Sequence, residues 1–220
     1  MSGINPKRVT VFVCVMAVIA IFIHGAQSVR EQQKAVAVVQ QHRVMEAAAE
    51  HAQYLARYVN TGFSRKPGSE TIAVAVASEN GTMNRAISAA LESRFQQEHA
   101  RILFPFFKSE FVSDGLFQEA FNGSGEILNK LELTKSLDGV VLAQQNVQYA
   151  QNSALENVIT ATMQLKVAVV PVSGQGGGKT WTFTAYGPGF TKEVARQSAE
   201  ERLIKQIAAD TKMSLTLQNH

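Results

Sequence analysis

The sequence has little cysteine, few charged residues and only a small excess of positive charge. The one cysteine among its 220 residues, Cys14, excludes a disulfide framework or a thiolate metal cluster within one chain. Charged residues make up 18% and the net charge is +3, a surplus too small to indicate nucleic-acid binding. The hydrophobic share of 45% excludes a wholly disordered chain. The length fits one domain of ordinary size with additional segments.

Charge is absent from residues 9–23, which read VTVFVCVMAVIAIFI. Together with the next three residues they give a helix of about 27 Å, at the short end of what spans a bilayer. We therefore predict a transmembrane helix over residues 9–26, with membrane lipid as a partner. The residues predicted to anchor the chain in the membrane are Val9, Val11, Phe12, Val13, Val15, Ile19, Ile21, Phe22 and Ile23.

The flanking residues predict the orientation of this helix. Lys7 and Arg8 precede the apolar run, which favours a short cytoplasmic tail over residues 1–8 and a bulk of the chain in the periplasm. A cleaved signal peptide has the same pattern. However, His24 stands two residues before Ala26, where a cleavage site prefers a small residue, so an uncleaved signal anchor in the bacterial inner membrane is favoured.

Two other interpretations of this segment fit less well. A lipoprotein signal requires small residues before its cysteine, but Phe12 and Val13 precede Cys14. A helix buried in a soluble core is normally apolar on one side only, whereas residues 9–23 are uncharged all round.

Residues 27–60 predict a helical stalk. Residues 28–59 contain neither glycine nor proline and are rich in Ala, Gln, Glu and Arg, a composition that favours helix. Apolar residues recur at coiled-coil spacing, which predicts self-association unless the helix docks this stripe on its own domain. The stripe consists of Val38, Met45, Ala48, Ala52, Leu55 and Val59. Gly62, Pro67 and Gly68 then indicate a linker over residues 61–70.

Residues 71–212 predict the folded domain, and residues 213–220 a tail. Alternating and helical patterns predict strands and helices in the order strand, helix, strand, helical pieces, three strands, helix. The ranges are 71–78, 83–99, 100–107, 113–137, 138–149, 157–172, 180–186 and 192–209. The fold class is therefore α/β, an α+β-like mixed sheet with flanking helices. The first two strands are expected to be parallel, the last two to form a hairpin, and residues 187–189 a turn.

This order and several segments resemble a known group of folds. The segments are IAVAVASEN, NRAISAALESRF, ARILFPFF, KSLDGVVLAQ and YGPGFTKEVARQSAEERLIKQIA. They are similar to the fold shared by the amino-terminal domain of TolB, the secretion lipoprotein CsgG and the LpoB-type activators of penicillin-binding proteins. The resemblance implies an envelope protein that binds other proteins or assembles into rings, without catalytic residues. The chain lacks the lipobox of CsgG and the activators, and the long insertions of the CsgG pore.

Motifs that suggest chemistry lack the required spacing. GGGKT at residues 176–180 has Ser173 where a phosphate loop needs glycine, and a strand pattern follows it. Ser124 lacks the surroundings of a nucleophile elbow. His42 and His51 are too far apart to share one helix face. We predict no catalytic residue, no cofactor, no metal site and no small-molecule substrate.

Aromatic side chains offer two interpretations. Phe106 and Phe107 belong to a phenylalanine cluster, and Trp181 lies in the predicted hairpin. Such residues usually pack in a core, but they also form partner-binding surfaces. We consider these three as a candidate partner surface.

The sequence predicts a non-catalytic protein-protein interaction module of a bacterial envelope assembly, acting as a regulator, adaptor or scaffold. Its partners are other envelope proteins and a second copy of itself. Two alternatives remain: a ring or filament subunit of a secretion or appendage machine, and an enzyme whose site is assembled from dispersed residues.

Overall fold

The computed structural model describes residues 38–65, 68–123, 125–151, 155, 157–173 and 178–215. The predicted cytoplasmic tail, the transmembrane helix over residues 9–26 and the first part of the stalk lie outside the described residues. None of the helices in the described part combines the length and the hydropathy needed to cross a bilayer.

The chain divides into two units, the first ending at Gln53 and the second beginning at Tyr54. The described part of the first unit, residues 38–53, is helical and exposed. The second unit begins earlier in the sequence than Thr71, where the pattern placed the start of the domain. Residues 54–58 are its first helical residues, and the side chains of Tyr58 and Val59 are buried in it.

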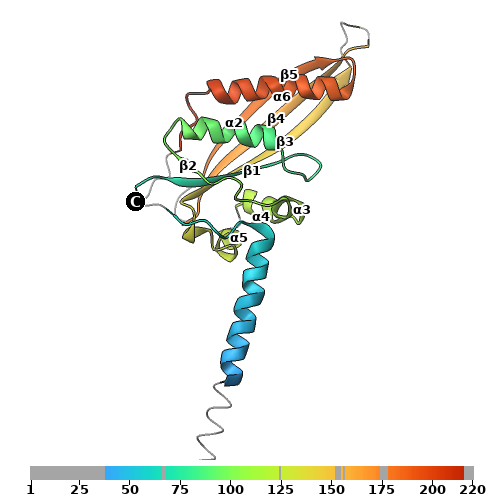
Figure 1. Cartoon of the computed structure of the whole chain (residues 1–220). Helices are drawn as coiled ribbons and strands as arrows, with labels where there is room; N and C mark the ends of the chain where they lie inside the picture. The colour runs from blue at the N-terminus through green and yellow to red at the C-terminus, as the bar shows by residue number, and fades with distance from the viewer. Residues whose placement is uncertain are drawn as a thin grey trace, which may run out of the picture. The chain divides into compact units, whose positions relative to one another are not determined.

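The second unit is a mixed α/β fold around a five-stranded sheet in the order β2-β1-β3-β4-β5 (Figure 1). β1 is parallel to β2 and β3, whereas β3, β4 and β5 pair antiparallel. The strands are β1 (Thr71–Ala77), β2 (Arg101–Ile102), β3 (Gly139–Gln151), β4 (Ile159–Pro171) and β5 (Lys179–Gly189). The helices are α2 (Arg85–Gln96), α3 (Ser109–Ser113), α4 (Leu116–Phe121), α5 (Gly125–Lys130), η1 (Leu133–Lys135) and α6 (Lys192–Ala209).

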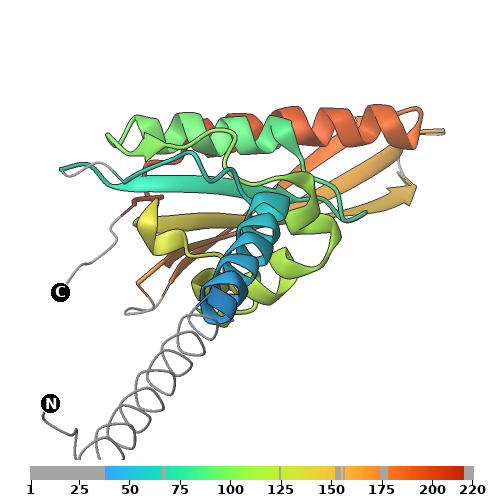
Figure 2. The same cartoon turned by 60° about the horizontal axis from the view of Figure 1, so that its bottom comes forward.

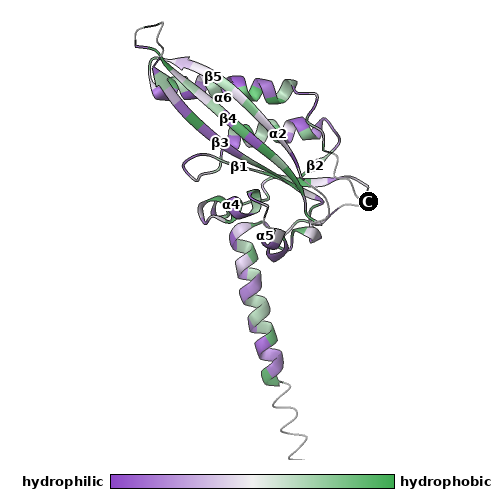
Figure 3. Cartoon of the chain, turned by 180° about the vertical axis from the view of Figure 1, so that it is seen from behind, coloured by the Kyte–Doolittle hydropathy of each residue, from purple (hydrophilic) through white to green (hydrophobic). Residues whose placement is uncertain are grey.

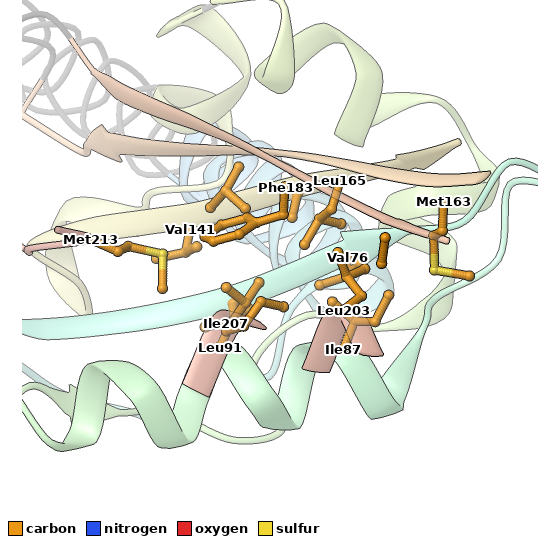
Figure 4. Packing of buried hydrophobic residues seen from close by; sticks show 14 of the residues in the cluster. Val76, Ile87, Leu91, Val141, Met163, Leu165, Phe183, Leu203, Ile207 and Met213 are labelled. Carbon is orange, nitrogen blue, oxygen red and sulfur yellow. The ribbon is translucent and has the colours of Figure 1, made fainter. Parts of the chain in front are cut away.

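Helices flank the sheet on both faces, as expected for a strand such as β1 whose residues 72–77 are all apolar. Every residue of β1 is buried, because both of its faces are covered. Its Ile72, Val74 and Val76 belong to a core cluster with α2 and α6, which lie side by side on one face (Figure 2). Side chains of this cluster interdigitate between sheet and helices (Figure 4). Ala73 and Ala75 face the second cluster, which contains residues of α3, α4 and α5.

Two predicted elements differ from the structure. The strand expected over residues 100–107 is reduced to Arg101–Ile102, and the following residues turn away so that Leu103, Phe106 and Phe107 enter the second cluster. The turn expected at residues 187–189 is instead the end of β5. A Cβ atom at Gly187 would lie 2.1 Å from the backbone nitrogen of Ala199, so glycine is required there because α6 crosses the strand at close range.

Candidate interaction site

A polar cavity of about 460 Å³ lies at the carboxyl end of β1. Asn84 connects the three elements around it. Its Nδ2 donates to Oε1 of Gln145 on β3 (2.9 Å) and to Oε2 of Glu200 on α6 (3.1 Å), while its Oδ1 accepts from the backbone nitrogen of Ile87 (3.1 Å). The same side chain therefore caps α2 and ties it to β3 and α6.

Two ion pairs between residues of α6 also line this cavity. Nη2 of Arg196 donates to Oε1 of Glu193 (2.7 Å) and Nη1 to Oε2 of Glu200 (3.3 Å). The hydrogen bond to Glu193 raises the pKa of Arg196, and the same bond lowers the pKa of Glu193. Burial, followed by the charge of Glu79, raises the pKa of nearby Tyr149. The Arg196 cation of the cavity is thus already engaged by carboxylates of the same chain.

Other polar side chains of the cavity form hydrogen bonds with the backbone around it. Oε2 of Glu79 accepts from the backbone nitrogen of Val147 at 3.1 Å. The hydroxyl of Ser78 donates to the carbonyl oxygen of Thr82 at 2.8 Å, which closes the turn before α2. Among the residues that line the cavity there is no histidine or cysteine, and Ser78 is bonded to turn residues rather than to a base, as a nucleophile would be.

Exposed apolar side chains occur close together in the sequence where β5 ends and α6 begins. Phe190 is 78% exposed, Tyr186 57% and Val194 50%. We call these three residues the β5–α6 corner. Lys192 lies between them in sequence, and its ammonium group is 5.5 Å from the ring centroid of Tyr149. Isolated exposed apolar residues are normal, but the 78% exposure of Phe190 just before α6 makes this position a candidate interaction surface.

The sequence interpretation did not identify this corner. Phe190 stands between the last residue of β5 and Thr191, whose hydroxyl oxygen accepts from the backbone nitrogen of Val194 at 3.2 Å and caps α6. It therefore belongs neither to the alternation of the strand nor to the apolar stripe of the helix. A phenylalanine immediately before a helix cap, outside both patterns, is the signal that would have identified it.

The structure places the predicted partner surface differently. Phe106 and Phe107 are 4% and 1% exposed, and their rings pack with centroids 5.1 Å apart inside the second cluster. They therefore correspond to the core-packing interpretation and present no surface. Trp181 is partly buried and packs against the first cluster from β5.

The predicted stalk stripe divides between the two units. Val38 and Met45 are each 65% exposed, and Ala48 and Ala52 are also exposed. Leu55 and Val59 pack in the second cluster instead. Val59 lies beyond the helix and forms an antiparallel bridge with Phe107, so the stripe does not continue to Val59 as a helical seam. Self-association through the exposed part stays a prediction.

Within the described residues, no three His, Cys, Asp or Glu side chains come together as metal ligands do.

Comparisons with known proteins give only distant similarities. No family model matches the chain, and no curated protein matches its sequence. The hypothetical protein CT253 from Chlamydia trachomatis has a TM-score of 0.41 and 14% identity, over 64% of this chain and 95% of that one. Lipoprotein GNA1162 from Neisseria meningitidis has a TM-score of 0.36 and 13% identity, over 64% and 99%. For the rare lipoprotein B from Shewanella oneidensis the values are 0.31 and 7%, over 62% and 85%. At these TM-scores the similarities support no argument about function, and the resemblance to TolB, CsgG and the LpoB-type activators stays a prediction.

Proposed function

We propose that the chain is a non-catalytic protein-interaction module of a bacterial cell envelope, anchored in the inner membrane through residues 9–26 with its α/β domain in the periplasm. The observation that carries the proposal is the β5–α6 corner. Its most exposed side chain, Phe190, precedes α6, the helix on which Glu200 accepts hydrogen bonds from both Asn84 and Arg196. A rigid apolar projection of this kind suits the docking of another protein.

The charges around the corner suggest the chemistry of the partner. Lys192 stands between Phe190 and Val194, and Arg202 donates from Nη1 to the carbonyl oxygen of Tyr186 at 3.0 Å. A partner surface with an apolar pocket for Phe190 and a carboxylate beside it complements this arrangement. The proposed module therefore binds an envelope protein through an acidic-rimmed apolar site.

Photocrosslinking in whole cells tests this surface. A benzophenone amino acid placed at residue 190 of the full chain is expected to give a discrete adduct with another protein. The same probe at Phe104, another exposed phenylalanine outside the corner (57% exposed), is the control and is expected to give none. Phe190→Asp is expected to abolish copurification of the captured protein. Equal adducts at residues 190 and 104 would contradict the assignment of the surface.

A reporter fusion tests the proposed topology separately. A periplasm-only reporter placed after residue 220 is expected to be active and a cytoplasm-only reporter inactive. The reverse result would overturn the periplasmic location while leaving the docking surface open to its own test.

A further inference from the structure

The outer edge of β5 carries backbone groups that the sheet does not use. β5 has 11 residues and is the last strand of the sheet, paired with β4 on one side (Figures 1 and 3). No strand among the described residues pairs with its other side. An open edge of this length is a template for a further strand unless it is blocked.

The carboxyl half of this edge is blocked. Arg202 donates to the carbonyl oxygen of Tyr186, so that carbonyl points away from β4. Because alternate residues of an antiparallel ladder direct their backbone groups to the same side, Pro188 also belongs to the outward set. It has no N–H to offer. One outward acceptor is thus already bonded and one outward donor is missing.

No described residue blocks the amino half of the edge. The same alternation places the outward backbone groups of this half at Thr180, Thr182 and Thr184. Their side chains lie on the sheet face opposite α6 and carry no charge that would repel another strand. Thr180 and Thr182 are exposed, and Thr184 is partly exposed.

We propose that residues 180–184 pair antiparallel with the same residues of a second copy of this chain, about a two-fold axis at Thr182. In this register Thr182 meets Thr182 of the second copy and Thr180 meets Thr184, so all three open residues are used in both chains. If the two-fold axis passed through another residue of β5, one of these three threonines would lack a partner residue or would lie opposite the blocked Tyr186. On the sheet face that carries α6, Trp181 then lies opposite Phe183 of the second copy. This cross-strand aromatic pair favours a second copy of the chain over an unrelated strand.

Charge reversal at the axis tests the pairing in the full chain. Thr182→Lys or Thr182→Glu places like charges directly opposite each other. We expect each variant alone to raise the dimer dissociation constant at least about tenfold, measured by light scattering after size exclusion in mild detergent. Coexpression of the Lys and Glu variants is expected to restore the dimer, because opposite charges then meet.

The matched control is Thr162→Lys on β4, whose neighbours on both sides are already paired strands. It adds the same charge on the same face and is expected to leave the dimer intact. Circular dichroism verifies that each variant is folded. A monomeric native chain, a dimer that persists in Thr182→Lys, or an edge occupied by a different protein would overturn the proposal. Because this segment is the opposite end of β5 from Phe190, its test and that of the docking corner fail independently.

Discussion

Nη2 of Arg94 on α2 lies 2.8 Å from the carbonyl oxygen of Met213, which is 119 residues away in the sequence. The same guanidinium donates from Nε to the carbonyl oxygen of Asp210 (2.7 Å) and pairs with Glu98 (2.8 Å). Glu98 in turn accepts from the backbone nitrogen of Leu215 at 2.8 Å. The start of the predicted tail is therefore part of the core, held against α2 by one arginine.

Replacement of Arg94 is expected to destabilise the domain strongly. Its side chain is 7% exposed, and Arg94→Met removes the donor to two carbonyl groups in a site that water reaches poorly. We expect a loss of about 2–4 kcal/mol in the free energy of unfolding, measured by urea denaturation. Lys130→Met, which breaks an exposed ion pair with Glu126, is expected to cost less than about 1 kcal/mol. Equal effects would contradict the importance of the buried clamp.

Replacing Gly187 by alanine is expected to change the free energy of unfolding far more than the same replacement at Gly62. A Cβ there would meet the carbonyl oxygen of Ala195 at 2.3 Å as well as the nitrogen of Ala199 at 2.1 Å, and backbone atoms of a helix cannot move aside singly. Gly187→Ala is expected to lower the free energy of unfolding by about 3 kcal/mol or more, because α6 must separate from β5. Gly62→Ala, with no atom within 4 Å of its Cβ, should leave thermal stability nearly unchanged.

The burial of Glu92 is expected to make the free energy of unfolding depend on pH. Its half-buried position raises the pKa to about 7 from 4.5, against the opposing charge of Arg85. The unfolded chain therefore loses this proton first as pH rises, so the contribution of Glu92 to stability is complete below pH 4.5 and is lost between there and about pH 7. Glu92→Gln stays neutral. Its urea midpoint should exceed that of the native chain at about pH 8 but not at about pH 4.

A control separates this effect from the general acid sensitivity of carboxylates. Glu201→Gln removes an exposed carboxylate from α6 and should retain the pH dependence of the native chain. A Glu92→Gln profile parallel to the native one across the whole range would show that Glu92 titrates normally.

Local patterns predicted those elements whose signals lie within one segment. The helix expected over residues 192–209 coincides with α6 (Lys192–Ala209), because Thr191 caps it and an apolar stripe runs along it. The alternation of residues 157–172 likewise predicted β4. By contrast, the short β2, the close approach at Gly187 and the burial of Phe107 depend on which elements meet in space. No periodicity within one segment records that information.

The cavity network shows the same limit, since Asn84 is separated by 61 residues from Gln145 and by 116 from Glu200. From the sequence, Asn84 is visible only as a helix cap. Its second role is visible only in the folded chain, where Gln145 is 3% exposed and its Nε2 donates to the sulfur of Met163 at 3.4 Å. The two roles of Asn84 can be separated by substitution.

Asn84→Ser retains a cap for α2 but removes the donor to Gln145 and Glu200, whereas Asn84→Ala removes both functions. We expect Asn84→Ala to cost about 2–4 kcal/mol, as the sum of a lost cap and a buried amide oxygen without its partner. Asn84→Ser should recover only the cap, about 1 kcal/mol of that loss. Urea denaturation of both variants measures the difference. If Asn84→Ser were as stable as the native chain, the hydrogen bonds from Asn84 to Gln145 and Glu200 would contribute nothing to the free energy of unfolding.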